Sequence, residues 1–242
     1  MSVWQAVFWG AVSSATLYLG QALAKPMAGA ARATGLVMAF GAGTLLSAVA
    51  YELIPASNFG DGLKIGAGVL LGAAVYLVCD AVIDRRGGTD RQRIADASAG
   101  GSGAAMFLGA LLDGVPEAFI LGLGLALGGA VNLAFLVAIA VSNIPQGIAG
   151  TASLRAAGYS GRTVFTMWTW LTVGCAATAG VGYVFADQLP AQGVYAEAFA
   201  AGAVLTMLTD SMMPESFRHG GRLAGLATVV GYLTAAALTF AQ

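Results

Sequence analysis

The chain has 242 residues, of which 58% are hydrophobic and only 10% are charged, whereas a soluble domain carries about 25% charged residues. So small a charged fraction excludes a water-exposed globular surface, and the net charge of −1 excludes the basic face that binds nucleic acid. The composition therefore predicts an all-α polytopic membrane protein with lipid around it and no nucleic-acid partner.

A helix needs about 20 mostly apolar residues to cross the hydrocarbon core of a bilayer. Eight segments meet this condition and form one transmembrane domain over 1–242: 3–24, 34–56, 62–83, 104–128, 131–154, 163–187, 193–215 and 221–240. The first segment has no basic residue before Lys25, so we expect a retained helix and not a signal peptide. The longest connection, 84–103, is rich in Gly, Arg, Asp and Ser, which predicts a flexible loop.

Lys and Arg lie almost entirely in the connections after the first, third, fifth and seventh segments. Ten of the eleven are there, and Lys64 is the exception: Lys25, Arg32, Arg85, Arg86, Arg91, Arg93, Arg155, Arg162, Arg218 and Arg222. Cytoplasmic loops carry the excess of Lys and Arg. We therefore expect loop 84–103 in the cytoplasm, both termini on the other side, and an inner-membrane location.

A polar-x-x-Pro pattern recurs in four segments, at Glu52–Pro55, Asp113–Pro116, Ser142–Pro145 and Ser211–Pro214. We interpret the first three and last three segments as inverted three-helix repeats that flank 104–128 and 131–154. Repeats with interrupted helices are typical of transporters, and their binding sites lie where the interruptions meet. The alternative interpretation is that membrane helices simply tolerate Pro.

Acidic residues inside the predicted spans are the most informative feature, because burying a carboxylate in the bilayer centre costs at least about 2.5 kcal/mol. No Lys or Arg lies deep in a span to neutralise them, so protons or a bound cation must do so. The candidates are Glu52, Asp80, Asp113, Glu117, Asp210 and Glu215.

Asp113 and Glu117 are four residues apart, so they share one face of a helix. Pro116 between them leaves the carbonyl of Leu112 without its usual hydrogen-bond donor, and Gly114 allows a neighbouring backbone to come close. Two carboxylates and a free carbonyl on one stripe favour a metal site, which we weigh against carboxylates that bind only protons.

The next segment offers neutral oxygen ligands. Ser142, Asn143 and Gln146 lie on either side of Pro145, which frees the carbonyl of Val141. These side chains could complete a metal site, or they could only form hydrogen bonds between helices.

The remaining polar residues have weaker assignments. Glu52 is interpreted as a gate or pathway ligand, and Asp210 either completes the central site or lies on the path to it. For both residues the alternative is a structural or interfacial role. Glu215 is interpreted as a helix-end ion pair on the surface with Arg218 or Arg222, and His219 as an exposed loop residue.

Two further patterns predict packing. Gly124 and Gly128 form a GxxxG pattern, from which we expect close helix contact within the bundle, and secondarily a homodimer. Cys79 and Cys175 are interpreted as two buried, unrelated thiols.

The paired Pro motifs resemble those of the ZIP (Zrt/Irt-like) family of divalent metal transporters, and the resemblance covers nearly the whole chain. The family typically shows His-Asn-x-Pro-Glu in its fourth helix, and here the sequence is Asp113-Gly114-Val115-Pro116-Glu117. Its fifth helix shows His-x-x-Pro-His/Glu/Gln-Gly, and here Ser142-Asn143-Ile144-Pro145-Gln146-Gly147 occurs. The family's second helix commonly shows His-Leu-Leu-Pro-Glu, where this chain has Glu52-Leu53-Ile54-Pro55-Ala56.

Both intramembrane histidines of the family pattern are absent, and Gly114 replaces an asparagine. The resemblance therefore implies one metal and not two, with oxygen ligands that suit Mn²⁺ or Mg²⁺ and still bind Zn²⁺.

The resemblance implies transport of a divalent cation, such as zinc, manganese or iron, toward the cytoplasm by alternating access. The first, fourth, fifth and sixth helices would move against the others. Asp113, Glu117, Asn143, Gln146 and Ser142 would hold the metal, with Asp210 and Glu52 nearby. We expect no enzyme activity and no organic cofactor. The alternatives are a non-transporting metal sensor or scaffold and a proton-coupled carrier of an organic solute.

Overall fold

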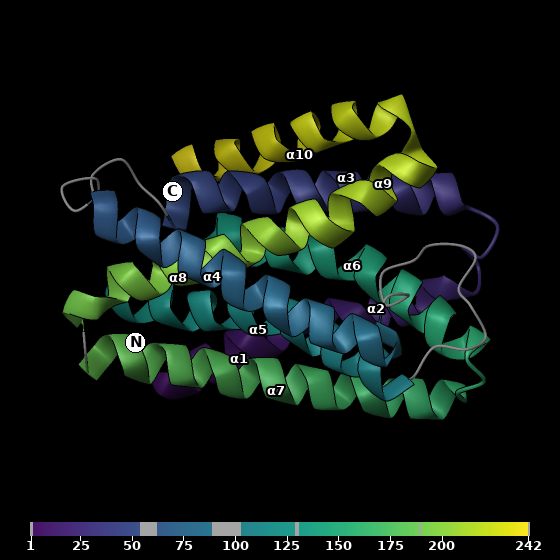
Figure 1. The fold of residues 1–242 in the computed structure, drawn as a ribbon, viewed down its shortest axis with the longest axis horizontal. Helices are drawn as coiled ribbons and strands as arrows, with labels where there is room; N and C mark the ends of the chain where they lie inside the picture. The colour runs from purple at the N-terminus through teal and green to yellow at the C-terminus, as the bar shows by residue number, and fades with distance from the viewer. Residues whose placement is uncertain (1, 54–61, 89–102, 129–130, 189, 242) are drawn as a thin grey trace.

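The structure is a computed structural model and describes residues 2–53, 62–88, 103–128, 131–188 and 190–241. This part of the chain is helical and contains no strand (Figure 1). The α-helices and the π-helical segments (η) are, in chain order, α1 (Val3–Ser14), α2 (Thr16–Ala24), α3 (Ala31–Ala48), η1 (Val49–Leu53), α4 (Gly62–Ile83), η3 (Asp84–Gly88), α5 (Gly103–Gly128), α6 (Leu133–Ala156), α7 (Gly161–Gln188), α8 (Pro190–Met207), η4 (Leu208–Met212), α9 (Met213–Gly220) and α10 (Arg222–Phe240).

Six helices within the described residues are long and apolar enough to cross a membrane: Ala31–Leu53, Gly62–Arg86, Ala104–Gly128, Leu133–Ala156, Gly161–Gln188 and Arg222–Phe240. The all-α membrane class is therefore confirmed. The other two predicted spans are each divided into shorter pieces, α1 with α2 and α8 with η4 and α9. The number of eight membrane crossings stays a prediction. Both termini lie at the same end of the bundle (Figure 1), which is the arrangement that an even number of crossings requires.

The first predicted span is divided at Ala15 by two serines. The hydroxyls of Ser13 and Ser14 both donate to the carbonyl oxygen of Gly10, each at 3.0 Å. Serine side chains that bond back to the preceding turn compete with the helical hydrogen bonds and bend the helix. The result is two short helices where hydropathy alone predicts one.

Two π-helical segments each carry an acidic residue and lie shortly before a proline. Glu52 lies in η1 and Asp210 in η4, and each segment ends two residues before the proline in the sequence. Pro214 cannot donate to the carbonyl of Asp210, so the turn before it widens. Pro55 lies outside the described residues. This shared local geometry is what the predicted repeat requires, and the inverted relation itself stays a prediction.

Two boundaries differ from the sequence prediction. The helical structure after the seventh span continues through α9 to Gly220, so His219 lies on a helix and not in a loop. The connection predicted to start at residue 84 begins with the π-helical turn η3, and its residues 89–102 lie outside the described residues.

Basic residues mark one end of the bundle. Lys25, Arg32, Arg155, Arg162 and Arg222 lie in or beside the turns at the end away from both termini (Figure 1). This charge asymmetry is the pattern that sets membrane orientation. It is what an extracytoplasmic position of the two termini requires.

We describe the helices as two units. The first unit contains α1, α2, α5, α6 and α7, in which α5 packs on α7, α2 on α6 and α1 on α7. The second unit contains α3, η1, α4, α8, η4, α9 and α10, in which α3 packs on α10 and α4 on α8. The boundary between the units is formed mainly by α3 against α6 and by α5 against α8 and η3, with smaller contributions from α10 against α6 and α4 against α5.

Glycines bring helix backbones into contact inside each unit. A Cβ added to Gly122 would lie 1.8 Å from the carbonyl oxygen of Ala179, and one added to Gly72 would lie 1.8 Å from that of Phe199. At the boundary the approach is looser, since a Cβ on Gly41 would lie 3.0 Å from the Cα of Ser142. Small residues at helix contacts allow this close packing in lipid.

The predicted close contact at Gly124 and Gly128 is wrong. A Cβ added to either glycine would meet no atom within 4 Å. Both glycines instead line a cavity described below. The spacing of a GxxxG pattern identifies a smooth helix face, but the neighbour of that face depends on the tertiary arrangement.

Candidate functional site

Asp113 and Glu117 lie in the middle of α5, and both are buried, with 1% and 3% of their surface exposed. Pro116 is accommodated inside the same helix, where it leaves the carbonyl of Leu112 without the usual donor. The helix contains no Lys or Arg. Two carboxylates are thus held in the protein interior, where charge is costly unless it is compensated.

The polar side chains of α6 are buried beside this pair. Ser142, Asn143 and Gln146 all lie in the interior, and the amide of Gln146 donates to Oδ2 of Asp113 at 3.3 Å. The structure thus brings the two Pro-containing motifs together through Asp113 and Gln146.

The other two α6 side chains have partners away from the carboxylates. The amide of Asn143 donates to the carbonyl oxygen of Ser13 at 3.2 Å, and the hydroxyl of Ser142 donates to that of Ile139 at 2.9 Å. An amide that donates through nitrogen keeps its side-chain oxygen available as an acceptor or ligand. Asn143 therefore retains a possible ligand atom, while Ser142 is used within its own helix.

Tyr76 of α4 is a site residue that the sequence did not reveal. Its hydroxyl donates to Oδ1 of Asp113, and its side chain is 1% exposed. A tyrosine in an apolar span gives no signal of its own. The available clue is that a buried Tyr hydroxyl requires a polar partner, and Asp113 is one of the few that the spans contain.

Cys175 of α7 lies against the same part of α5. A Cβ added to Gly114 would lie 2.9 Å from its sulfur atom, and its thiol is hydrogen-bonded to Ser14 and close to Glu117. Cys175 is buried as predicted, but Cys79 is exposed, which contradicts the prediction of two buried thiols. Gly114 makes room for this sulfur, because a Cβ there would require the sulfur atom to shift.

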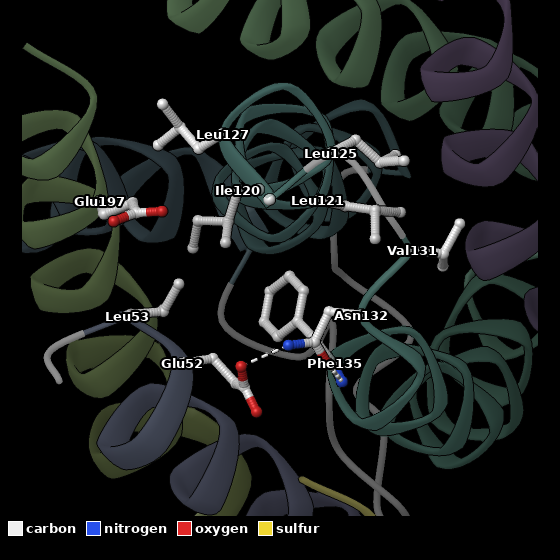
Figure 2. A pocket seen from close by; sticks show the side chains of 12 residues that line it. Glu52, Leu53, Ile120, Leu121, Leu125, Leu127, Val131, Asn132, Phe135 and Glu197 are labelled. Atoms are coloured by element: carbon white, nitrogen blue, oxygen red, sulfur yellow. Dashed lines mark hydrogen bonds between the residues drawn. The ribbon is translucent and has the colours of Figure 1, made fainter. Parts of the chain in front are cut away.

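A cavity of about 440 Å³ lies at the end of the bundle that carries both termini (Figures 1 and 2). We call it the acidic cavity because Glu52 of η1 and Glu197 of α8 line it, facing the ends of α5 and α6 (Figure 2). Ile120 and Leu121 also line it, three and four residues beyond Glu117 on α5. The cavity therefore reaches within one helical turn of the buried carboxylates.

Glu52 is held from two sides. The amide of Asn132 donates to Oε2, and the hydroxyl of Thr239 donates to Oε1 at 2.7 Å. Asn132 is also the N-cap of α6, since its side-chain oxygen accepts from the backbone N–H of Phe135 at 2.9 Å. Glu197 of the cavity was not among the residues predicted to form the site. The sequence feature that could have identified Glu197 is its position, as an acidic residue, inside the predicted span 193–215.

Two further acids of the second unit lie elsewhere. Asp210 is exposed on η4. Glu215 contacts Arg218 at 3.8 Å and His219 at 3.0 Å, so the predicted ion pair with Arg218 is confirmed. Glu215 is only 8% exposed, however, and His219 is half-buried, so neither is the surface residue that the sequence predicts.

Oxygen atoms dominate the candidate centre. Among the described residues, no three side chains of the types His, Cys, Asp and Glu lie close enough together to hold a metal ion. Two carboxylates with amide oxygens are nevertheless a ligand set that suits hard divalent cations, and carboxylate oxygens also bind Zn²⁺. Any cation held here would depend on Gln146 or Asn143 as well as on the acids.

No family model matches the sequence. A protein of Arabidopsis thaliana described as a "Putative zinc transporter" is 25% identical over 202 residues, which is 81% of this chain. The match covers 32% of that protein, so the chain spans about a third of its length. The chain is thus distantly similar to part of a protein that is described as a transporter of zinc.

Proposed function

We propose that this protein carries a divalent metal cation across the membrane and holds it at Asp113 and Glu117, with Gln146 and Asn143 completing the shell. The observation that carries the proposal is the meeting of the two Pro-interrupted helices at Asp113 and Gln146. The carboxylates are buried in helices without a central Lys or Arg. A bound cation would compensate their charge.

The packing of the helices supports transport by alternating access. All four proposed ligands belong to the first unit, and Tyr76 of the second unit contacts Asp113 across the boundary. The first unit contains the helices predicted to move together. A site carried by one unit and covered by the other becomes accessible from either side when the units shift.

The acidic cavity supports a route into the site. Its carboxylates, Glu52 and Glu197, would raise the local concentration of cations, and its wall reaches Ile120 and Leu121 beside Glu117. With the basic end of the bundle in the cytoplasm, the cavity opens on the extracytoplasmic side. We propose uptake toward the cytoplasm across the inner membrane.

The chemistry of the ligands restricts the metal ions that the protein could transport, but it does not select a single one. The described relative is named for zinc, and oxygen ligands bind Zn²⁺ as well as the harder Mn²⁺ and Fe²⁺. We propose that the cargo is one of these three ions.

The test is uptake into proteoliposomes loaded with a metal indicator, using Zn²⁺, Mn²⁺, Fe²⁺ and Mg²⁺ separately. Wild-type protein should take up at least one ion faster than empty vesicles do. Asp113→Asn and Glu117→Gln should each lower the rate about 100-fold, since each removes a charged ligand worth roughly 3 kcal/mol. Asp187→Asn is the matched control, because that carboxylate is exposed at the end of α7.

Uptake no faster than in empty vesicles, or normal rates for both site variants, would overturn the proposal. Metal binding without uptake would instead favour the sensor or scaffold.

A further inference from the structure

Two of the hydrogen bonds that cross the boundary between the units end on a carboxylate. Tyr76 of the second unit donates to Asp113 of the first, and Asn132 of the first donates to Glu52 of the second. By contrast, Tyr18 donates to Thr169 at 3.1 Å entirely within the first unit. Cation-binding groups and cross-unit contacts therefore coincide.

Tyr76 is held firmly by its own unit. It lies one turn after Gly72, whose Cβ position would be 1.8 Å from the carbonyl oxygen of Phe199 on α8. Its ring lies in a buried apolar core that contains residues of both units. Because the backbone contact holds α4 against α8, the hydroxyl stays with the second unit and can follow Asp113 only if the two units move together.

Asp113 is held from both units at once. Oδ2 accepts from Gln146 of its own unit at 3.3 Å, while Oδ1 accepts from Tyr76. An empty buried carboxylate needs such donors, because an uncompensated charge is costly to bury. A bound cation would supply that compensation itself and leave the carboxylate a weaker acceptor.

We infer that Tyr76 is a positioning residue whose hydrogen bond to Asp113 holds the empty site against the second unit, and that cation binding at Asp113 breaks this hydrogen bond. The inference rests on the proposed function, since it assumes that Asp113 takes the cation. Tyr76 would thereby couple cation binding to the movement of the units. The hydrogen bond holds the units together when the site is empty, and the units can shift when a cation is bound.

Asn132 makes a second connection of the same kind at the acidic cavity (Figure 2). Its amide contacts Glu52, which Thr239 of α10 holds from the other side at 2.7 Å. A cation that enters the cavity would compete for the same carboxylate. Both hydrogen bonds between the units therefore lie on the proposed path of the cation.

The experiment measures the distance between the units with spin labels on the natural Cys79 of α4 and on an introduced Phe165→Cys of α7. Both positions are exposed, and they lie on different units. Without metal, wild type should give a narrow distance distribution that Zn²⁺ or Mn²⁺ broadens or shifts. Metal-free Tyr76→Phe should already resemble the loaded wild type. Tyr18→Phe, which loses a tyrosine hydrogen bond inside one unit, should resemble the empty wild type.

A binding measurement on the same proteins tests the release. Tyr76→Phe removes a donor that only the empty carboxylate needs, so Kd for the cation should fall by up to about tenfold. A Tyr76 that merely supports the bound geometry would instead weaken binding when it is substituted.

The inference would be overturned if the distances between the units in metal-free Tyr76→Phe equal those of metal-free wild type. It would also be overturned if Tyr76→Phe binds the cation more weakly than Tyr18→Phe does. If wild type binds and moves no cation, the proposed function fails, and the release by cation fails with it.

If Tyr76→Phe does not fold, Asn132→Ser takes its place. Serine keeps the cap of α6 but loses the amide that reaches Glu52. Unchanged distances between the units in this variant without metal would overturn the inference.

Discussion

Contacts inside each helical unit differ in kind from contacts between the units. Inside the units, backbones touch through glycines such as Gly122 and Gly72, at positions where no Cβ fits. Between the units the backbones stay farther apart, as at Gly41 and Ser142, and the side-chain hydrogen bonds of Tyr76 and Asn132 cross the boundary. Backbone contact leaves no room for sliding, whereas side chains and hydrogen bonds can be exchanged at modest cost.

This difference indicates where the molecule can move. The candidate ligands Asp113, Glu117 and Gln146 all lie on α5 and α6 of the first unit, where Gln146 donates to Asp113, yet Asp113 borders the second unit. A binding site for transport needs both properties, since its ligands must stay together while its surroundings change.

The largest expected effect is loss of the folded protein when a contact inside a unit is filled. Gly122→Ala would place a Cβ 1.8 Å from the carbonyl oxygen of Ala179, so α5 and α7 must separate, at a cost of about 3 kcal/mol. Thermal unfolding in detergent should show a clear fall in Tm. Gly124→Ala is the control, because its Cβ meets no atom within 4 Å. Equal stability of the two variants would contradict the rigid-unit interpretation.

A smaller effect is expected from the amide that joins the two Pro-containing helices. Gln146→Leu removes a candidate ligand oxygen from the shell of the cation, so cation affinity should weaken about tenfold, or about 1.4 kcal/mol. Calorimetric titration measures this change. Gln21→Leu is the matched control, because Gln21 donates to the carbonyl of Gly161 in an exposed part of the first unit. Similar affinity in both variants would remove Gln146 from the site.

The smallest effect is expected in the acidic cavity. Glu197→Gln lowers the negative charge of the cavity without changing the buried ligands, so KM for uptake should rise roughly threefold while the maximal rate stays unchanged. Added salt should reduce the difference, because it screens charges that solvent can reach. A fall in the maximal rate, or no difference from Asp187→Asn at low salt, would show that Glu197 does not collect cations.

Much of the fold was predictable because lipid imposes a local rule. Segments such as 62–83 and 131–154 are apolar for long enough to span a bilayer, and the structure has α4 and α6 at these places. The helical break at Ser13 and Ser14 was not predicted, because hydropathy does not register a side chain that bonds back to its own helix.

The candidate site was predictable in part for a similar reason. Helical spacing puts Asp113 and Glu117 on one face, and the two Pro motifs meet as the sequence suggested. The partners from other helices, Tyr76 and Cys175, could not be found this way. Periodicity says which side of a helix is polar, but not which helix lies opposite.

The sequence by itself determined a membrane protein whose buried acids lack basic partners, because the cost of charge in lipid is a property of each span. Only the tertiary structure decided that α5 lies against α7 and borders α4, so that Gly122 makes a close contact while Gly124 faces a cavity. Helix neighbours are set by the shapes of many faces at once. The division into two units, and the hydrogen bond of Tyr76 across it, follow from that arrangement.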